Sequence, residues 1–265
     1  MTTPEPRADV VARLRAAGCV FAEEEAGLLV EAATSVTGVD DATLESLVEQ
    51  RVAGIPLEHL VGWAEFAGLR IAVGNGVFVP RRRTEFLAAQ AIDSARTAHP
   101  VVVDLCCGTG AVAAAIGAAL PAAELIASDI DPDATRYASV NLAERGSVFT
   151  GDLFDALPPW LLGRVEILVA NAPYVPTDDI ATMPSEARVH EHRVALDGGA
   201  DGLDLQRRII AGVARWLAPQ ATVLIETSAR QADTTLQLLR DAGFDAHAEY
   251  SEEHEATVAI GRASA

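Results

Sequence analysis

The chain has 265 residues and a net charge of −18, and 50% of its residues are hydrophobic. This length accommodates one large α/β domain with a small additional module, and the apolar fraction excludes a fully disordered chain. The acidic balance argues against direct binding of a nucleic acid, because phosphate backbones are bound by basic surfaces.

The cysteines are Cys19, Cys106 and Cys107, and an odd number that includes an adjacent pair does not indicate a disulfide framework. We therefore expect a reducing, cytoplasmic environment. The first residues form no apolar signal region, and no apolar run approaches the ~18 residues that cross a membrane. A monomer without membrane contact is the default expectation.

The first part of the chain is expected to be a small helical module. Apolar residues recur at helical spacing through residues 8–60, without the alternation that is typical of strands. Residues 63–80 change to a hairpin pattern, with turns at Gly68 and at Gly74-Asn75-Gly76.

Strands and helices alternate in the rest of the chain, after a helix over 85–97 for which Thr84 is the expected N-cap. This alternation predicts a parallel, doubly wound sheet, to which the last two strands add an antiparallel hairpin. Strands are expected at 101–103, 125–127, 147–150, 167–170, 221–226, 245–250 and 256–261, and helices at 111–120, 133–144, 204–217 and 229–241.

A glycine-rich turn, Asp104-Leu105-Cys106-Cys107-Gly108-Thr109-Gly110, follows the first of these strands and opens a helix. Gly108 and Gly110 permit a close approach of the backbone to a nucleotide, and Asp129 at the next strand end can accept both ribose hydroxyls. This pattern fits NAD as well as S-adenosylmethionine. Asp104 favours S-adenosylmethionine, because a carboxylate suits its cationic methionine portion and would lie awkwardly beside a pyrophosphate.

The adenine ring is expected near the third strand. Asp152 can accept from the adenine amino group, with Ile130 or Leu153 against the ring. Cys106 lies within the cofactor-binding turn, where it is expected to be a small packing residue. The alternative reading of Asp104 and Asp152 is that each carboxylate only caps its own turn.

The tetrapeptide Asn171-Ala172-Pro173-Tyr174 ends the fourth strand. It resembles the Asn-Pro-Pro-Tyr motif of methyltransferases that modify planar nitrogens. An amide nitrogen is a poor nucleophile because its lone pair is delocalised into the carbonyl. The side-chain oxygen of Asn171 and the carbonyl of residue 172 can each accept one N–H, which holds that nitrogen and favours charge density on it. Tyr174 can stack on the planar group.

No metal is required for this chemistry. His190-Glu191-His192 offers no third ligand at a suitable spacing, so a solvated helix is expected there in place of a metal site.

Four further segments carry a family resemblance: Arg51–Gly62, the pair Glu65-Phe66 and Val77–Arg81, Thr84-Glu85, and Ala195–Asp204. Together with the tetrapeptide they resemble the HemK/PrmC protein-(glutamine-N5) methyltransferases, which act on peptide-chain release factors. The resemblance implies a class I S-adenosylmethionine-dependent methyltransferase fold, with a Rossmann-like seven-stranded sheet whose last strand is antiparallel. It also implies a helical substrate-recognition domain over 1–62, a linking β-hairpin over 63–82 and a catalytic domain over 83–265.

The resemblance further implies methyl transfer to the glutamine of a Gly-Gly-Gln loop in a class I release factor, with S-adenosylhomocysteine as the product. Phe78 would lie near the cofactor, and Asn171 with Ala172 would hold the glutamine amide.

Two departures from the family pattern leave the methyl acceptor open. Ala172 replaces a proline, which keeps the accepting carbonyl but loses rigidity. Arg82 and Arg83 replace a proline and an acid, so that three arginines stand in a row, as a solvated turn or as a grip on an acidic or phosphate-bearing partner. The alternatives are a small-molecule or peptide N-methyltransferase, an adenine or cytosine amino-methyltransferase, and a cofactor-binding protein without catalysis.

Overall fold

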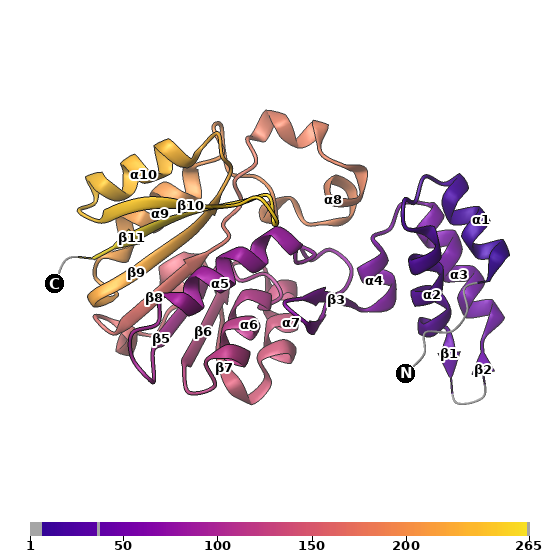
Figure 1. Cartoon of the computed structure of the whole chain (residues 1–265), viewed down its shortest axis with the longest axis horizontal. Helices are drawn as coiled ribbons and strands as arrows, with labels where there is room; N and C mark the ends of the chain where they lie inside the picture. Colours follow the sequence, from indigo (N-terminus) through magenta and orange to yellow (C-terminus); the bar gives the residue numbers. More distant parts are fainter. Residues whose placement is uncertain (1–6, 36–37, 264–265) are drawn as a thin grey trace.

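A helical module lies apart from a large α/β body in the computed structural model, which describes residues 7–35 and 38–263 (Figure 1). Its helices are α1 (Ala8–Ala16), α2 (Ala22–Ala32) and α3 (Asp41–Val52). Leu14, Leu29 and Val48 are at the centre of a separate hydrophobic core between these helices. The expected helical character of this part of the chain is confirmed.

The strands in this part of the chain correct two expectations. β1 (Thr34–Ser35) pairs with β2 (Gly38–Val39), although no strand was expected there, because two residues carry no detectable period. The predicted hairpin is shorter than expected. It consists of β3 (Trp63–Phe66) and β4 (Leu69–Ala72), and the chain beyond forms only a bridge between Gly76 and Glu191.

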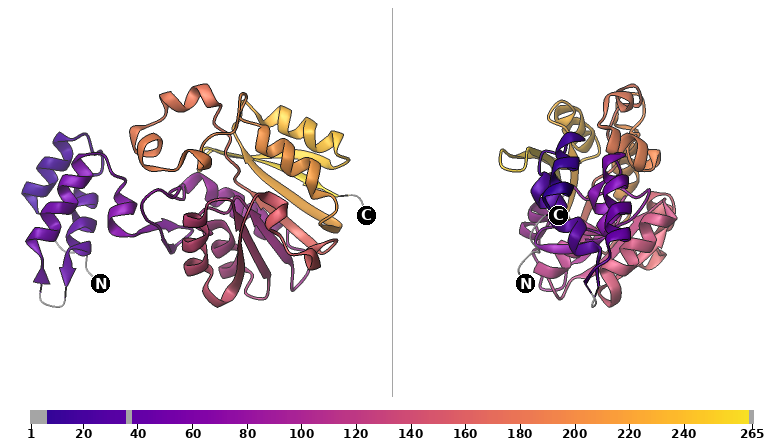
Figure 2. Two further views of the ribbon diagram at one scale, coloured as in Figure 1. Left: turned by 180° about the vertical axis from the view of Figure 1, so that it is seen from behind. Right: turned by 90° about the vertical axis from the view of Figure 1, so that its right-hand side faces the viewer.

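A buried arginine connects the module to the α/β body. Arg51 near the end of α3 is bonded to Glu25 of α2 through Nε at 2.6 Å and to Glu186 through Nη1 at 2.6 Å. Glu186 lies on α8 (Ser185–His190), in the long segment that follows the Asn171 tetrapeptide. α4 (Leu57–Val61) joins the two parts, and its His59 donates to the Val77 carbonyl at 3.0 Å. Figure 2 shows the same separation of the module from behind.

The central sheet has seven strands in the order β10-β11-β9-β8-β5-β6-β7. Neighbouring strands are parallel except where β11 runs antiparallel to β9 and β10, which confirms the predicted class I methyltransferase topology. The strands are β5 (Val101–Leu105), β6 (Glu124–Asp129), β7 (Gly146–Thr150), β8 (Val165–Ala170), β9 (Leu217–Thr227), β10 (Asp245–Ser251) and β11 (Ala256–Arg262).

Helices cover both faces of this sheet, because its central strands are apolar on both sides. α5 (Glu85–Asp93), α6 (Ala111–Ala119) and α7 (Pro132–Leu142) pack on one face. α9 (Asp204–Val213) and α10 (Ala232–Asp241) pack on the other. The carboxyl ends of β5, β6, β8 and β9 thereby meet at one edge, where ligands bind in open α/β sheets.

Thr84 does not have the predicted capping role. Its backbone is helical, with φ −71° and ψ −13°, and its side chain makes no cap hydrogen bond. The reason is that a 3₁₀ turn at Arg82–Thr84 already precedes α5 and satisfies its first amides. This leaves the Thr84 hydroxyl for another partner.

Candidate active site

One cavity of about 730 Å³ opens at the carboxyl edge of the sheet. This volume is in the range of pockets that bind cofactors and small ligands. The cavity is bordered by the glycine-rich turn, the ends of β6 and β8, and the segment that follows β8. Of the predicted site residues, it is lined by Phe78, Cys106, Gly108, Asp129, Ile130, Asp152, Leu153, Asn171, Ala172, Pro173 and Tyr174.

The glycine-rich turn places one glycine at the cavity and one away from it. Gly108 has φ +55°, lines the cavity and has no heavy atom within 4 Å of the position of an added Cβ, so its backbone faces open space. Gly110 has φ +76° and begins α6, where an added Cβ would lie 3.1 Å from the Cβ of Ala138. The structure therefore does not bring Gly110 to the cavity wall, because this glycine permits close packing of α6 against α7.

Asp104 is not at the cavity either. Its side chain points toward α6, where Oδ2 accepts from the Ala113 amide at 3.1 Å, and only 1% of the residue is exposed. Burial, opposed by that amide, raises the pKa of Asp104 to about 8. The structure therefore does not place Asp104 among the residues that line the cavity, because strand alternation turns its side chain toward α6.

Asp129 lies where a ribose is expected. Its Oδ2 accepts from the Gly108 amide at 2.8 Å and its Oδ1 accepts from the Asp131 amide at 2.9 Å. Burial raises the pKa of the Asp129 carboxyl, and these two amides partly oppose the shift. Each oxygen keeps a further lone pair for a ligand hydroxyl.

The far end of the cavity combines a charge with apolar surface. The Asp152 carboxylate accepts from Arg208 at 2.7 Å, a partner that was not predicted. Leu153, with φ +47°, is buried at the cavity wall, and Ile130 is 49% exposed. An apolar wall beside a carboxylate suits a planar ring with an amino group.

Asn171 presents an unused oxygen at the cavity. Its Nδ2 donates to Thr84 Oγ1 at 3.2 Å, and no described residue donates to its Oδ1. Ala172 as a whole is buried in the core, although it also lines the cavity, and no backbone amide of the described residues donates to its carbonyl. Asn171 Oδ1 and the carbonyl of the next residue are therefore acceptors without a hydrogen-bond donor among the described residues.

The segment 196–204 packs against the tetrapeptide loop and is hydrogen-bonded to the residue that follows it. The Val175 amide donates to the Leu196 carbonyl at 3.2 Å, and the Gly198 amide donates to the Val175 carbonyl at 2.9 Å. A Cβ at Gly198 would lie 2.7 Å from the carbonyl oxygens of Pro173 and Gly202. Gly198 is thus required by its contact with the loop.

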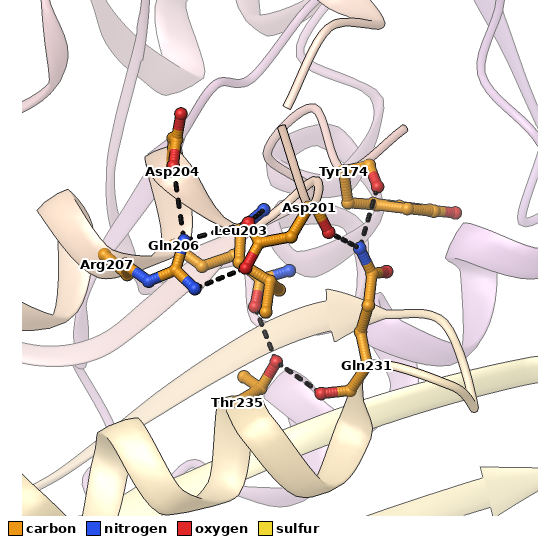
Figure 3. Close-up of polar contacts among 8 residues, drawn as sticks. All are labelled: Tyr174, Asp201, Leu203, Asp204, Gln206, Arg207, Gln231 and Thr235. Carbon is orange, nitrogen blue, oxygen red and sulfur yellow. Dashed lines mark hydrogen bonds and ion pairs between the residues drawn. The ribbon is translucent and has the colours of Figure 1, made fainter. Parts of the chain in front are cut away.

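Gln231 fixes both parts of this arrangement. Its Nε2 donates to the carbonyls of Tyr174 at 3.0 Å and of Asp201 at 2.9 Å (Figure 3). On the same side, Arg207 bonds Asp201 and Asp204, at the start of α9. Sequence reasoning did not find Gln231, because a helix-end glutamine carries no signal of its distant partners.

A buried acid behind Tyr174 was also missed. The Tyr174 hydroxyl donates to Glu226 Oε1 at 3.2 Å, and the Arg83 guanidinium carbon lies 5.7 Å from the tyrosine ring centroid. Burial raises the pKa of Glu226 and also, together with the Glu226 charge, that of Tyr174. The only sequence signal is that an acid follows the apolar residues at the carboxyl end of β9.

The arginine run is not uniformly solvated. Arg81 pairs with the buried Glu191, which also accepts from the Val79 amide at 3.2 Å, and Arg83 pairs with Glu226 at 3.4 Å. Arg82 is the most exposed of the three, and its Nη2 lies 3.7 Å from Glu253 Oε1. The expectation of a solvated helix at 190–192 is likewise wrong, because α8 ends at His190 and Glu191 turns inward to Arg81.

Known proteins are similar to this chain in sequence and in fold. The sequence matches the family described as Methyltransferase small domain over residues 70–202. A methyltransferase from Pyrococcus furiosus shares the fold, with a TM-score of 0.57 at 12% identity over 75% of this chain and 90% of that one. No helix within the described residues is long and apolar enough to cross a membrane.

Curated relatives share more of the sequence. The release factor glutamine methyltransferase of Mycolicibacterium smegmatis is 41% identical, over 72% of this chain and 70% of its own. That of Deinococcus radiodurans is 36% identical over 252 residues, which cover 89% of each chain. At these identities and coverages, the relatives show that the chain belongs to the release factor glutamine methyltransferase family.

Proposed function

We propose that this chain transfers a methyl group from S-adenosylmethionine to the side-chain amide nitrogen of a glutamine in a peptide-chain release factor. The observation that carries the proposal is that the cavity is lined by Asn171, whose Oδ1 accepts no hydrogen bond from the described residues, and by Ala172, whose carbonyl accepts none from their backbone amides. A primary amide has two N–H donors, and two adjacent acceptors match them.

These acceptors act on the nucleophile. Hydrogen bonds from both N–H groups orient the amide nitrogen and favour charge density on it, as the transfer requires. Ala172 can do this as well as a proline, because the accepting atom is a backbone oxygen. Its burial in the core supplies rigidity that the missing ring would have given.

The remainder of the cavity fits the cofactor. S-adenosylmethionine, when bound, supplies an electrophilic methyl group on a sulfonium ion. Gly108 leaves open space beside its backbone, and Asp129 has lone pairs for the ribose hydroxyls. Asp152, Ile130 and Leu153 provide the polar and apolar surfaces for adenine. The product, S-adenosylhomocysteine, would be bound by the same residues until it dissociates.

We further propose that residues 1–62 form a substrate-recognition domain, linked by 63–82 to a catalytic domain over 83–265. The Arg51 ion pairs support this division of labour, because they fix the helical module to α8, within the segment that follows the tetrapeptide. A class I release factor bound to the module would then meet the cavity directly. Such a protein acts in translation termination, so we place the reaction in the cytoplasm, with the chain as a monomer and without direct nucleic-acid contact.

A transfer assay tests the proposal. The chain is mixed with S-adenosylmethionine carrying a tritiated methyl group and with a class I release factor from the same source. We expect label in the release factor with its Gly-Gly-Gln loop and none when that glutamine is replaced by alanine. Equal label in both proteins, or none in either while the chain still binds the cofactor, would contradict the proposed substrate.

A further inference from the structure

A buried carboxyl lies directly behind the acceptor loop. Glu226 is 1% exposed, and its Oε1 accepts from the Tyr174 hydroxyl at 3.2 Å and forms an ion pair with Arg83 Nε at 3.4 Å. Its second oxygen, Oε2, is buried without a hydrogen-bond partner among residues 7–35 and 38–263. Buried polar atoms are nearly always paired, so an unused acceptor here calls for a function.

Thr84 lies between this carboxyl and Asn171. It is buried, and its Oγ1 accepts from Asn171 Nδ2 at 3.2 Å. A hydroxyl also has one proton to donate. The Thr84 hydroxyl is close enough to Glu226 to oppose the burial-driven rise in the pKa of that carboxyl. Because Glu226 Oε2 is buried and accepts no hydrogen bond from the described residues, it is a free acceptor beside the Thr84 hydroxyl.

The direction of these bonds decides which end of Asn171 meets the substrate. The two ends of an asparagine amide are nearly equal in shape, so hydrogen-bond partners select its orientation. An ionised carboxylate can only accept. It thus turns the Thr84 proton toward itself, which leaves the Thr84 oxygen to accept from Asn171 Nδ2. Asn171 Oδ1 is then directed to the substrate nitrogen.

We propose that Glu226 is a positioning residue, which fixes the orientation of the Asn171 amide through Thr84 and the Tyr174 ring through its hydroxyl. The inference rests on the proposed function of Asn171. It adds the group that makes Asn171 an acceptor toward the substrate. Arg83 supports it, because a cation at 3.4 Å keeps the buried carboxyl charged.

The arrangement depends on the charge of Glu226. Burial raises the pKa of this carboxyl, and contacts with Thr84, Arg83 and Tyr174 oppose the rise. Arg83 and Tyr174 are the charged or titratable groups that face it, since its β11 partner is Val258 and the adjoining end of β8 is apolar. A protonated Glu226 can donate to Thr84 and reverse the chain of bonds. Turnover should therefore fall as the pH drops through the raised pKa of Glu226.

The kinetic test uses Glu226→Gln, with Glu252→Gln as an exposed control of the same chemistry. At saturating cofactor and release factor we expect kcat to fall about tenfold or more in Glu226→Gln, with an unchanged cofactor Kd. The acid limb of kcat due to Glu226 should disappear. Thr84→Val should show the same loss, and Thr84→Ser, which keeps the hydroxyl, should restore most of it. An unchanged kcat in Glu226→Gln or in Thr84→Val would overturn the proposal.

An NMR titration gives a readout that needs no turnover. The side-chain amide signals of Asn171, assigned by their loss in Asn171→Ser, should shift with pH in the natural chain and not in Glu226→Gln. The absence of this shift in the natural chain would refute the orientation of Asn171 by Glu226 through Thr84, even if the enzyme is active. A pH-dependent shift without any methyl transfer would support this role of Glu226 and reject only the proposed function. If Glu226→Gln does not fold, the Thr84 variants decide the question.

Discussion

The two halves of the cavity are built in different ways. The cofactor half consists of the glycine-rich turn and the ends of β6 and β7, and its main hydrogen bonds are from backbone amides to Asp129. The acceptor half joins segments that are far apart in the chain, since Asn171 meets Thr84 across 87 positions and Tyr174 meets Glu226 across 52. Substrate choice therefore rests on side chains that distant elements hold in place, and cofactor binding rests on a local turn.

The largest expected effect tests the acceptor half alone. Asn171→Ala should lower kcat by about 10²–10³-fold, because it removes one of two hydrogen bonds to the reacting amide. The cofactor Kd, measured by calorimetry, should stay within about twofold, since this residue lies outside the turn that surrounds Gly108. Asn75→Ala, at an exposed position, serves as the control. A loss of cofactor affinity equal to the loss of turnover would show that the two halves are not separate.

The converse test changes the cofactor half. Asp129→Asn should weaken cofactor binding about tenfold or more, because hydrogen bonds to a charged group are worth roughly 1.5–3 kcal/mol. Burial raises the pKa of Asp129, and the charged form accepts the ligand hydroxyls. Cofactor affinity should therefore fall as the pH drops through this raised pKa, and the dependence should be absent in the variant. A cofactor Kd equal to that of the natural chain would remove Asp129 from the site.

A glycine pair separates backbone strain from contact with the acceptor loop. Gly202 and Gly243 have φ of +77° and +90°, but only at Gly202 would a Cβ collide with the Tyr174 carbonyl. Both alanine variants should lose about 1 kcal/mol of unfolding free energy from strain. Only Gly202→Ala should also lower kcat, by about tenfold, through a displaced loop. Equal kcat values in the two variants would show that the segment 196–204 does not hold the loop.

The smallest expected effect concerns the stability of the cofactor turn. Cys106 has φ +56°, in the left-handed region that favours glycine, whereas Cys107 is buried with an ordinary negative φ. Cys106→Gly should raise the unfolding free energy by up to about 1 kcal/mol, and Cys107→Gly should lower it by a similar amount. Chemical denaturation measures both, and a destabilised Cys106→Gly would argue that its side chain is needed for packing.

The difference between the cofactor half and the acceptor half of the cavity also explains what the sequence could predict. Apolar runs separated by helices were sufficient for the strands from Val101 to Arg262 and for the topology of the sheet. Asp129 and Gly108 line the cavity, and their signals lie within one strand–turn–helix unit. Asp104 and Gly110 do not line it, because a motif gives residue types, whereas strand alternation and helix packing decide where each points.

The acceptor half was predicted only in part. The tetrapeptide at Asn171 was visible as a contiguous motif, but Glu226, Gln231 and the hydroxyl of Thr84 carry no local signal of their partners. The arginine run shows the limit most clearly, because only tertiary packing gives Arg81 and Arg83 buried acidic partners and leaves Arg82 with an exposed one.

The site of methylation is the most direct test of glutamine methylation by this chain. A class I release factor is incubated with the chain and S-adenosylmethionine, digested, and analysed by fragmentation mass spectrometry. We expect one added methyl group on the side-chain nitrogen of the Gly-Gly-Gln glutamine, and none with the Asn171→Ala variant. A methyl group on any other atom, or on this nitrogen at an unchanged rate without Asn171, would contradict it.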